Sequence, residues 1–354
     1  MNQVYLSDGE IKDNLYPLTL TRSAADIRVG ILSIREKWRA FLGADPVITS
    51  EENDVQDTGL ILSANIIPGR RFVESLFNPD GSPSENPAWD AVKIIQYPWH
   101  IFQWNDWAIR EDFQLLTAGR QSAPIPATVQ TIDPQNIFIE EGAKMAHCII
   151  NAEGGPVYIG KNATVMEGTM IRGPVAICEN ATIKMGAKIY EATTIGPHVV
   201  AGGEIKNSVI FGYSNKSHDG YLGNSVIGEW CNIGGGTSTS NMKNNASEIR
   251  MWSHTQQQMI LSGINKCGLI MGDHSKAAIN TSFNTGTTVG VSANIFGEGP
   301  VPKYVPSFSW GGRGPLKYQF EKAVEDIDKW KKLKHGSLSE HEKTMLRLIF
   351  DQIK

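Results

Sequence analysis

The sequence predicts an α/β unit, then an all-β parallel β-helix, then C-terminal α-helices. The main evidence is a six-residue period of aliphatic residues, with a small or β-branched residue four positions after each of them. This period matches neither the 3.6 residues of an α-helical turn nor strand alternation, and it is typical of hexapeptide repeats that coil as a parallel β-helix. A Pro-rich segment precedes the repeats, and two helical patterns follow them. The aliphatic series is Ile159, Val165, Ile171, Ile177, Ile183, Ile189 and Ile195.

Length and composition bound the class of protein. A chain of 354 residues predicts two or three domains, each with its own core. We place them at residues 1–125, 126–300 and 301–354. The formal charge of -4 argues against a nucleic-acid binder, which would carry a basic excess.

Cysteine usage and the N-terminus indicate a cytoplasmic protein. The four cysteines show no CxxC spacing, which suggests a reducing compartment, no disulfide framework and no metal site. The first residues, MNQVYLSDGEIKDN, lack the basic start and apolar stretch of a signal peptide. No apolar run approaches the roughly 20 residues that a membrane span needs.

Residues 1 to about 120 are expected to form a separate α/β unit. Gly59–Ser63 resembles a short buried strand, and Ile27–Leu42 has helical spacing. Trp99, Trp104 and Trp107 fall close together in the sequence. They are interpreted either as an aromatic core that joins this unit to the next or as a base-stacking platform.

The repeat is not uniform along the chain. Residues 121–136 are predicted to be a linker, and the repeat phase slips after Val200 before it returns with Tyr221. Residues 238–268 are polar and irregular, and are expected to leave the β-helix. Leu316–Leu333 and Ser339–Ile353 are candidate amphipathic helices, the second opening close to a capping pattern.

Phase slips and insertions in solenoids collect on the working face, and here they bracket three polar residues. Glu204 and Asn241 are 37 positions apart, close to two coils, so we expect them on one edge about 10 Å apart. His218 lies in the loop between them. A carboxylate, an imidazole and an amide would suit proton removal from an amine, with the histidine as base. The alternative is that His218 is only a polar loop residue.

The same segment resembles a known family. Glu204–Val209, Lys216–His218, Tyr221–Gly228 and Cys231–Thr237 are similar to the acetyltransferase half of bifunctional N-acetylglucosamine-1-phosphate uridyltransferase/glucosamine-1-phosphate acetyltransferase. The resemblance covers about residues 137 to 300. It implies a left-handed β-helix, a homotrimer, and acetyl-CoA bound between neighbouring subunits.

The resemblance also implies roles for individual residues. The catalytic histidine of the family falls on His218, its partnering glutamate on Glu204 and its active-site asparagine on Asn241. Lys206 would hold the sugar phosphate as a point charge. Tyr221 would contact the sugar, although its repeat phase fits a core position equally well.

Other contacts are implied less directly. Backbone N–H groups near Gly235 and Gly236, or the amide of Asn241, would stabilise an oxyanion. The family's phosphate-binding arginine has no counterpart, and the equivalent coil offers Lys188 and Tyr190. Met242 stands where the family often has tyrosine. Lys276 lies in a segment that resembles archaeal-type sugar-phosphate acyltransferases, and is a candidate coenzyme-A contact.

The first unit lacks the GxGTR loop with which nucleotidyltransferases approach nucleotide phosphates. Tyr16–Arg22 and Arg28–Trp38 instead resemble a variant group of sugar nucleotidyltransferase-like proteins. Arg22, Arg28 and Lys37 would then meet a nucleotide, with Mg²⁺ as a further cofactor if the unit is active. Structural or degenerate roles for these cations are the alternative.

Three functions follow in order of preference. The first is an acetyl-CoA-dependent N-acetyltransferase that acts on an amino-sugar 1-phosphate. The second adds sugar-1-phosphate nucleotidyl transfer by the first unit. The third is a non-catalytic trimeric scaffold that binds nucleotide-sugars.

Overall fold

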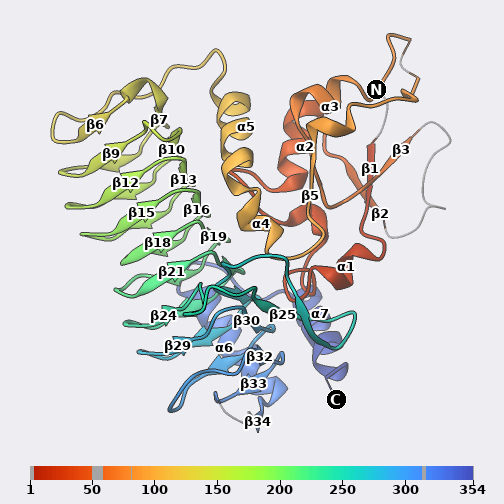
Figure 1. Ribbon diagram of the computed structural model, residues 1–354, viewed down its shortest axis with the longest axis vertical. Helices are drawn as coiled ribbons and strands as arrows, with labels where there is room; N and C mark the ends of the chain where they lie inside the picture. Colours follow the sequence, from red (N-terminus) through yellow and green to blue (C-terminus); the bar gives the residue numbers. More distant parts are fainter. Residues whose placement is uncertain (1–3, 50–58, 81, 313–315, 354) are drawn as a thin grey trace.

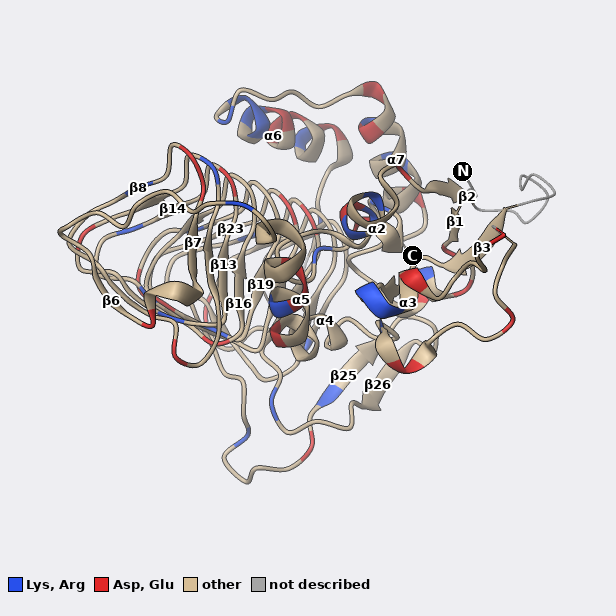
Figure 2. Cartoon of the chain, turned by 90° about the horizontal axis from the view of Figure 1, so that it is seen from above, with Lys and Arg blue, Asp and Glu red and all other residues tan. Residues whose placement is uncertain are grey.

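The computed structural model describes residues 4–49, 59–80, 82–312 and 316–353. A β-solenoid of about ten turns runs from about residue 130 to residue 310, and an α/β unit packs beside its upper turns (Figure 1). Three sheets form the walls of the solenoid, and Figure 2 shows them nearly end-on as a triangle. The predicted fold, a left-handed parallel β-helix preceded by an α/β unit and followed by helices, is confirmed.

Each wall is a ladder in which strands of successive coils pair in parallel, apart from the last pair, β33 with β34. The nine-stranded sheet contains β7 (Ile137–Ile139), β10 (Val157–Ile159), β13 (Val175–Ile177), β16 (Thr193–Ile195), β19 (Val209–Ile210), β22 (Val226–Ile227), β27 (Leu269–Met271), β30 (Thr287–Val289) and β32 (Tyr304–Val305). The ten-stranded sheet contains β8 (Lys144–Met145), β11 (Thr164–Val165), β14 (Thr182–Ile183), β17 (Val200–Ala201), β20 (Asn215–Lys216), β23 (Asn232–Ile233), β28 (Lys276–Ala277), β31 (Asn294–Ile295), β33 (Ser309–Trp310) and β34 (Leu316–Lys317). The six-stranded sheet contains β6 (Gln130–Ile132), β9 (Ile149–Asn151), β12 (Met170–Arg172), β15 (Lys188–Tyr190), β18 (Glu204–Lys206) and β21 (Tyr221–Gly223), and the pair β24 (Ser238–Thr239) and β29 (Ser282–Phe283) follows further along the solenoid.

The aliphatic series fills the interior of the solenoid, because alternation in each short strand turns one side chain inward and its neighbours outward. All seven predicted aliphatic residues are at most 2% exposed. After Ala201 the coils shorten, and the buried positions fall at Ile205, Ile210, Lys216 and Leu222. Of the predicted return of the repeat at Tyr221, Ile227 and Ile233, the last two are buried as predicted and only the first is displaced, by one residue. A core position for Tyr221 is wrong, and Leu222 takes that place.

The corner between the nine- and ten-stranded sheets places one residue per coil in the left-handed region. Asn162, Asn180, His198, Tyr213 and Trp230 occupy it, with φ between 55° and 63°. Left-handed backbone strains residues with a Cβ, and asparagine tolerates it better than most. The aromatic members stack, with ring centroids 4.7 Å apart for His198 and Tyr213 and 4.3 Å apart for Tyr213 and Trp230.

The α/β unit contains a three-stranded parallel sheet in the order β2, β1, β3. Its described elements are β1 (Val4–Ser7), α1 (Ile11–Asn14), η1 (Ala24–Asp26), α2 (Ile34–Leu42), β2 (Val47–Thr49), β3 (Leu60–Ser63), β4 (Ile66–Ile67), α3 (Arg70–Glu74), η3 (Trp89–Ala91), β5 (Lys93–Ile94), α4 (His100–Gln103) and α5 (Asn105–Thr117). The predicted helix at Ile27–Leu42 begins only at Ile34, where Ser33 and Glu36 form a capping box. The N–H groups of Ile31 and Leu32 instead bind the Asp112 carboxylate.

The core of this unit continues into the nine-stranded sheet. Trp99 and Phe72 share one cluster of buried residues with Phe211, Val226 and Ile270 of the β-helix. The aromatic-core interpretation is therefore confirmed for Trp99, which is 2% exposed, and Trp104 and Trp107 pack against the same cluster. The domain boundaries at residues 125 and 300 stay a prediction, because two contacting units can share one core.

Two segments depart from the regular coils. The predicted linker at 121–136 already contains β6 and η4 (Pro134–Asn136), so the first coil begins earlier than expected. The excursion at 238–268 carries the antiparallel hairpin of β25 (Arg250–Ser253) and β26 (Gln258–Leu261). The two C-terminal helices are α6 (Phe320–Lys332) and α7 (Glu340–Asp351), and a capping box at Ser339 opens α7 as predicted.

Helix α6 covers the ten-stranded sheet. Just beyond its end, the Lys334 ammonium donates to the carbonyls of His198 and Tyr213 at 2.8 and 2.9 Å. Within the described ranges, no helix has the length and apolarity needed to cross a membrane.

Candidate active site at the edge of the six-stranded sheet

The outer face of the six-stranded sheet carries two columns of polar side chains. Parallel register places Lys188, Glu204 and Tyr221 in one column, on three successive strands. Tyr190 and Lys206 pair in the second column. The intervening residues of each strand point into the core, so the columns arise from simple alternation.

Hydrogen bonds tie these columns together. The Tyr190 hydroxyl donates to Oε1 of Glu204 at 2.5 Å, and the Lys206 ammonium lies 5.1 Å from the centre of the Tyr190 ring. The Asn241 amide donates to the Tyr221 hydroxyl at 3.1 Å and to Oδ1 of Asn224 at 2.8 Å. The structure thus brings Glu204, Tyr221 and Asn241 to one face, as the two-coil spacing predicted.

Burial and the neighbouring Glu204 carboxylate both raise the pKa of the Tyr190 and Tyr221 side chains. Burial, and then the hydrogen bond to Glu204, raise the pKa of Tyr190 above its usual value. Burial and the negative charge of Glu204 also raise the pKa of Tyr221. Both hydroxyls therefore remain donors at neutral pH.

His218 lies at the corner between β20 and β21, at the rim of the same face, and its side chain is exposed. Gly203, directly before Glu204, passes beneath this loop, and a Cβ there would lie 2.8 Å from the His218 carbonyl oxygen. Within the part of the chain that the structure describes, the imidazole has no hydrogen-bond partner. Glu204 and His218 thus occupy one corner, but the Glu204 carboxylate bonds to Tyr190 rather than to the imidazole.

The backbone of the His218 loop is held from inside the solenoid. Lys216 takes a core position and is 2% exposed. Its ammonium donates to the carbonyls of Gly202, at 3.0 Å, and of His218. Burial lowers the pKa of Lys216 to about 8, so the two carbonyls offset only part of the desolvation.

The glycine turn of the next coil lies against His218. A Cβ on Gly235 would lie 3.4 Å from the His218 Cβ, so glycine leaves the space around the ring open. The Gly236 N–H is already bonded to the Asp219 carbonyl at 3.0 Å. The Gly235 N–H has no partner among the described residues, and is one backbone donor near His218 that an oxyanion could use. Both N–H groups of the Asn241 amide are engaged.

Three residues to which the sequence analysis gave no role also belong to this site: Tyr190, Asn224 and Lys216. Asn224 precedes Asn241 by 17 residues, the length of one shortened coil, and that spacing could have identified it. Lys216 stands six residues after Ile210, where the repeat expects an aliphatic residue. A lysine at a core position is itself a signal of an internal hydrogen-bonding role.

Lys276 is not part of this arrangement. It lies on β28 in the ten-stranded sheet, beneath α6, with its ammonium 5.3 Å from the centre of the Trp330 ring. Lys188 is exposed on the outer face beside Glu204. Of Lys188 and Lys276, only Lys188 therefore lies at the candidate active site.

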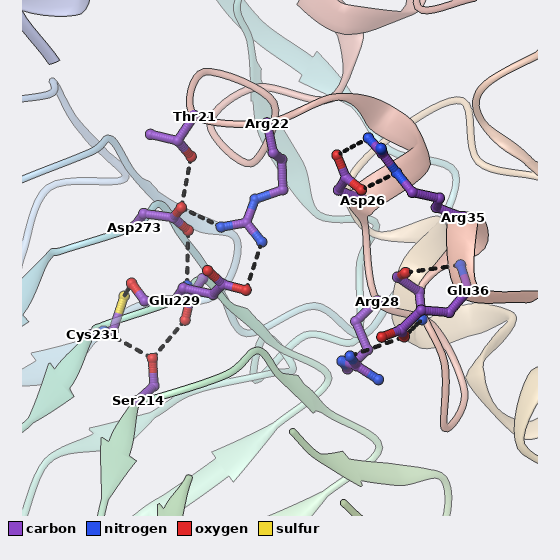
Figure 3. A network of polar contacts seen from close by, with 12 residues as sticks. Thr21, Arg22, Asp26, Arg28, Arg35, Glu36, Ser214, Glu229, Cys231 and Asp273 are labelled. Atoms are coloured by element: carbon purple, nitrogen blue, oxygen red, sulfur yellow. Dashed lines mark hydrogen bonds and ion pairs between the residues drawn. The ribbon is translucent and has the colours of Figure 1, made fainter. Parts of the chain in front are cut away.

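The three cations predicted to meet a nucleotide are engaged in ion pairs, and Figure 3 shows those of Arg22 and Arg28. Arg22 binds Asp273 and lies 3.2 Å from a Glu229 carboxylate oxygen. These pairs link the α/β unit to the β-helix, and the Arg22 side chain is 9% exposed.

Arg28 and Lys37 are paired within the α/β unit. Arg28 pairs with Glu36 at 3.1 Å, and Lys37 pairs with Asp112 where both side chains are 2% exposed. The structure therefore favours the structural alternative for Arg22, Arg28 and Lys37.

The α/β unit contains a cavity away from these cations. Its volume is about 880 Å³, and it lies beside β3 and the segment 84–97. Trp89 and Tyr97 provide aromatic surface, while Asn65 and Gln96 provide amide groups. Neither Arg22, Arg28 nor Lys37 lines it.

Comparison with known proteins supports the family resemblance. A family model described as sugar nucleotidyl transferase matches residues 4–76 and 73–121. A bifunctional sugar-1-phosphate nucleotidylyltransferase/acetyltransferase of Sulfurisphaera tokodaii is 30% identical over 223 residues, 58% of this chain and 47% of that protein. The bifunctional protein GlmU of Methanocaldococcus jannaschii is 34% identical over 87 residues, 25% of this chain and 21% of that protein.

Over part of its length the chain is similar in sequence to GlmU-like bifunctional transferases. It spans about half the length of the first GlmU-like relative and a smaller share of the second. Among solved structures, UDP-N-acetylglucosamine acyltransferase of Francisella novicida aligns at 15% identity with a TM-score of 0.33, covering 65% of this chain and 88% of that chain.

Proposed function

We propose that this GlmU-like chain is an acetyl-CoA-dependent N-acetyltransferase that acts on an amino-sugar 1-phosphate, with His218 as general base. The observation that carries the proposal is the exposed imidazole of His218, which has no hydrogen-bond partner among the described residues and lies against the Gly235 turn. An imidazole titrates near neutral pH and suits proton transfer from an amine.

The proposed reaction balances as an acyl transfer. The 2-amino group attacks the thioester carbonyl and loses a proton to His218. The tetrahedral oxyanion accepts a hydrogen bond from the Gly235 N–H, in the manner of an oxyanion hole. Collapse of the intermediate breaks the C–S bond, and the imidazolium returns its proton to the departing thiolate. The products are an amide and free coenzyme A.

The outer face would hold the sugar phosphate. Lys188 and Lys206 flank Glu204 and supply positive charge for the phosphate, while Tyr221 and Asn241 offer hydrogen-bonding groups to the sugar. In this proposal Lys276 does not contact coenzyme A, because α6 covers it.

A homotrimer is part of the proposal. The outer face also exposes Ile132, Ile149 and Met170, which are 51%, 43% and 45% accessible, on the coils before the site. Exposed apolar side chains grouped on one wall are suited to contact with a neighbouring copy. The predicted cytoplasmic location stays a prediction.

Purified protein is expected to release free thiol from acetyl-CoA when glucosamine-1-phosphate is supplied. Lys206→Met should raise the KM for the sugar phosphate about tenfold or more, since a hydrogen bond to a charged group is lost. Thiol release measured with a chromogenic reagent tests both expectations. Lys144→Met, on the ten-stranded sheet, is the matched control and should behave as wild type. Failure of every amino-sugar phosphate to support thiol release would overturn the proposal.

A second function is favoured by the cavity of the α/β unit. We propose that this cavity binds a nucleoside triphosphate or nucleotide-sugar, with the uracil or another base against Trp89 or Tyr97. Titration calorimetry with UTP and with UDP-N-acetylglucosamine tests binding, and pyrophosphate release tests transfer with Mg²⁺ present. Binding without turnover would favour a scaffold role for the unit, and no binding would contradict both alternatives.

A further inference from the structure

A small cavity separates α6 from the ten-stranded sheet. Its volume is about 270 Å³, below the usual range for drug-sized ligands but enough for a small metabolite. The β-helix contributes His274 and Lys276 from one coil and Ser292 and Asn294 from the next. Helix α6 closes it with Asp326 and Trp330, while Ala323 and Ile327 provide apolar wall.

The polar groups of this cavity are incompletely satisfied. The Lys276 ammonium donates to the His274 carbonyl at 3.2 Å and faces the Trp330 ring. No carboxylate of the described residues lies within ion-pair distance of it. The Ser292 hydroxyl is buried, in a residue that is 3% exposed, and it has no hydrogen-bond partner among the described residues.

The acidic group in the cavity wall is already engaged. The Tyr318 hydroxyl donates to Asp326, and the Lys329 ammonium lies 3.8 Å from the same carboxylate. His274 contributes no charge at neutral pH, because burial lowers its pKa to about 4. Asp326 attracts the Lys276 ammonium only from beyond ion-pair distance, so the cavity holds a positive charge at Lys276 that no described carboxylate pairs directly.

Leaving an ammonium without a counter-charge in a desolvated place is costly. Consistent with this, burial lowers the pKa of Lys276 to about 8. A bound anion would restore the charged form and satisfy the Ser292 hydroxyl at the same time. A void lined by apolar residues alone would have no such requirement.

We propose that this cavity is a binding site for a small oxyanion, a phosphate or carboxylate group, held by Lys276 and Ser292 beneath α6. The site is separate from the candidate acetyl-transfer site, since Lys276 lies on a covered wall and His218 lies at an open corner. The proposal does not depend on the proposed function. Because α6 forms one side of the cavity, the bound anion would also fasten this helix to the β-helix.

Titration calorimetry with inorganic phosphate and with acetate tests the site, against sodium chloride at equal ionic strength. Tryptophan fluorescence gives a second readout, because Trp330 lines the cavity, and Trp330→Phe should remove that change. We expect one of the two anions to bind and to raise the melting temperature, as any ligand specific to the folded state does. Comparison of the two titrations shows whether the site prefers a phosphate or a carboxylate group.

Lys276→Met should weaken binding by about 10- to 100-fold, the range expected for a lost hydrogen bond to a charged group. Ser292→Ala should weaken it by about tenfold, and carries the test if the lysine variant does not fold. Lys332→Met on the exposed side of α6 is the matched control and should bind as wild type. The proposal would be overturned if neither phosphate nor acetate binds, or if the Lys276 and Lys332 variants bind the anion with equal affinity.

Discussion

Replacing His218 with alanine is expected to lower the rate of thiol release by about 10²- to 10⁴-fold, the usual contribution of a general base. The side chain is exposed and makes no hydrogen bond among the described residues, so the fold should not depend on it. Melting temperature and the far-ultraviolet circular dichroism spectrum should therefore match those of the wild type. Activity measured with saturating substrates reports the loss in kcat.

His147→Ala is the matched control for this experiment. His147 is also exposed and occupies the same corner of the solenoid, between β8 and β9, several coils away from the site. Its removal should leave the rate unchanged. A His218→Ala enzyme with full activity would exclude the imidazole as the base and leave the polar-loop alternative.

Replacing Lys37 with methionine is expected to destabilise the protein by about 3–5 kcal/mol, because it leaves a buried carboxylate without its partner. The pair of Lys37 and Asp112 is almost fully buried, and burial lowers the pKa of Lys37 while raising that of Asp112. Asp112 also fixes the turn before α2 through two backbone N–H groups. Urea unfolding followed by tryptophan fluorescence measures the loss.

Arg35→Met on the same helix is the control, because its ion pair with Asp26 is 36% exposed on both sides. It should cost only about 0–1 kcal/mol, the range for surface pairs. The nucleotide-binding interpretation predicts the opposite pattern for Lys37→Met: unchanged stability together with lost UTP binding. That result would contradict the structural role.

The sequence predicts the regular coils well because each repeat is a local pattern. Ile159 to Ile195 follow a constant period, so the interior of those coils can be read directly. The core alternative for Tyr221 fails by one residue because the coils after Ala201 shorten, and a one-residue slip exchanges the inner and outer faces of a strand. Short-range pattern therefore fixes most of the β-helix but not its irregular coils.

The candidate site was predictable in part for the same reason. Coil-length spacing placed Glu204 and Asn241 together, but the Tyr190 bond to Glu204 depends on which side chains meet across strands. The pairing of Arg22 with Asp273 joins residues 251 positions apart. Such a contact leaves no pattern in a single sequence, so Arg22 could be interpreted equally well as a ligand for phosphate.

Trp99 of the α/β unit and Phe211 of the β-helix belong to one buried cluster, so the α/β unit shields this part of the β-helix from water. Without that unit, the nine-stranded sheet would expose a large hydrophobic surface to water, and the solenoid would be prone to aggregation. Selection would then retain the α/β unit because it buries this face of the β-helix, whether or not the unit transfers nucleotides.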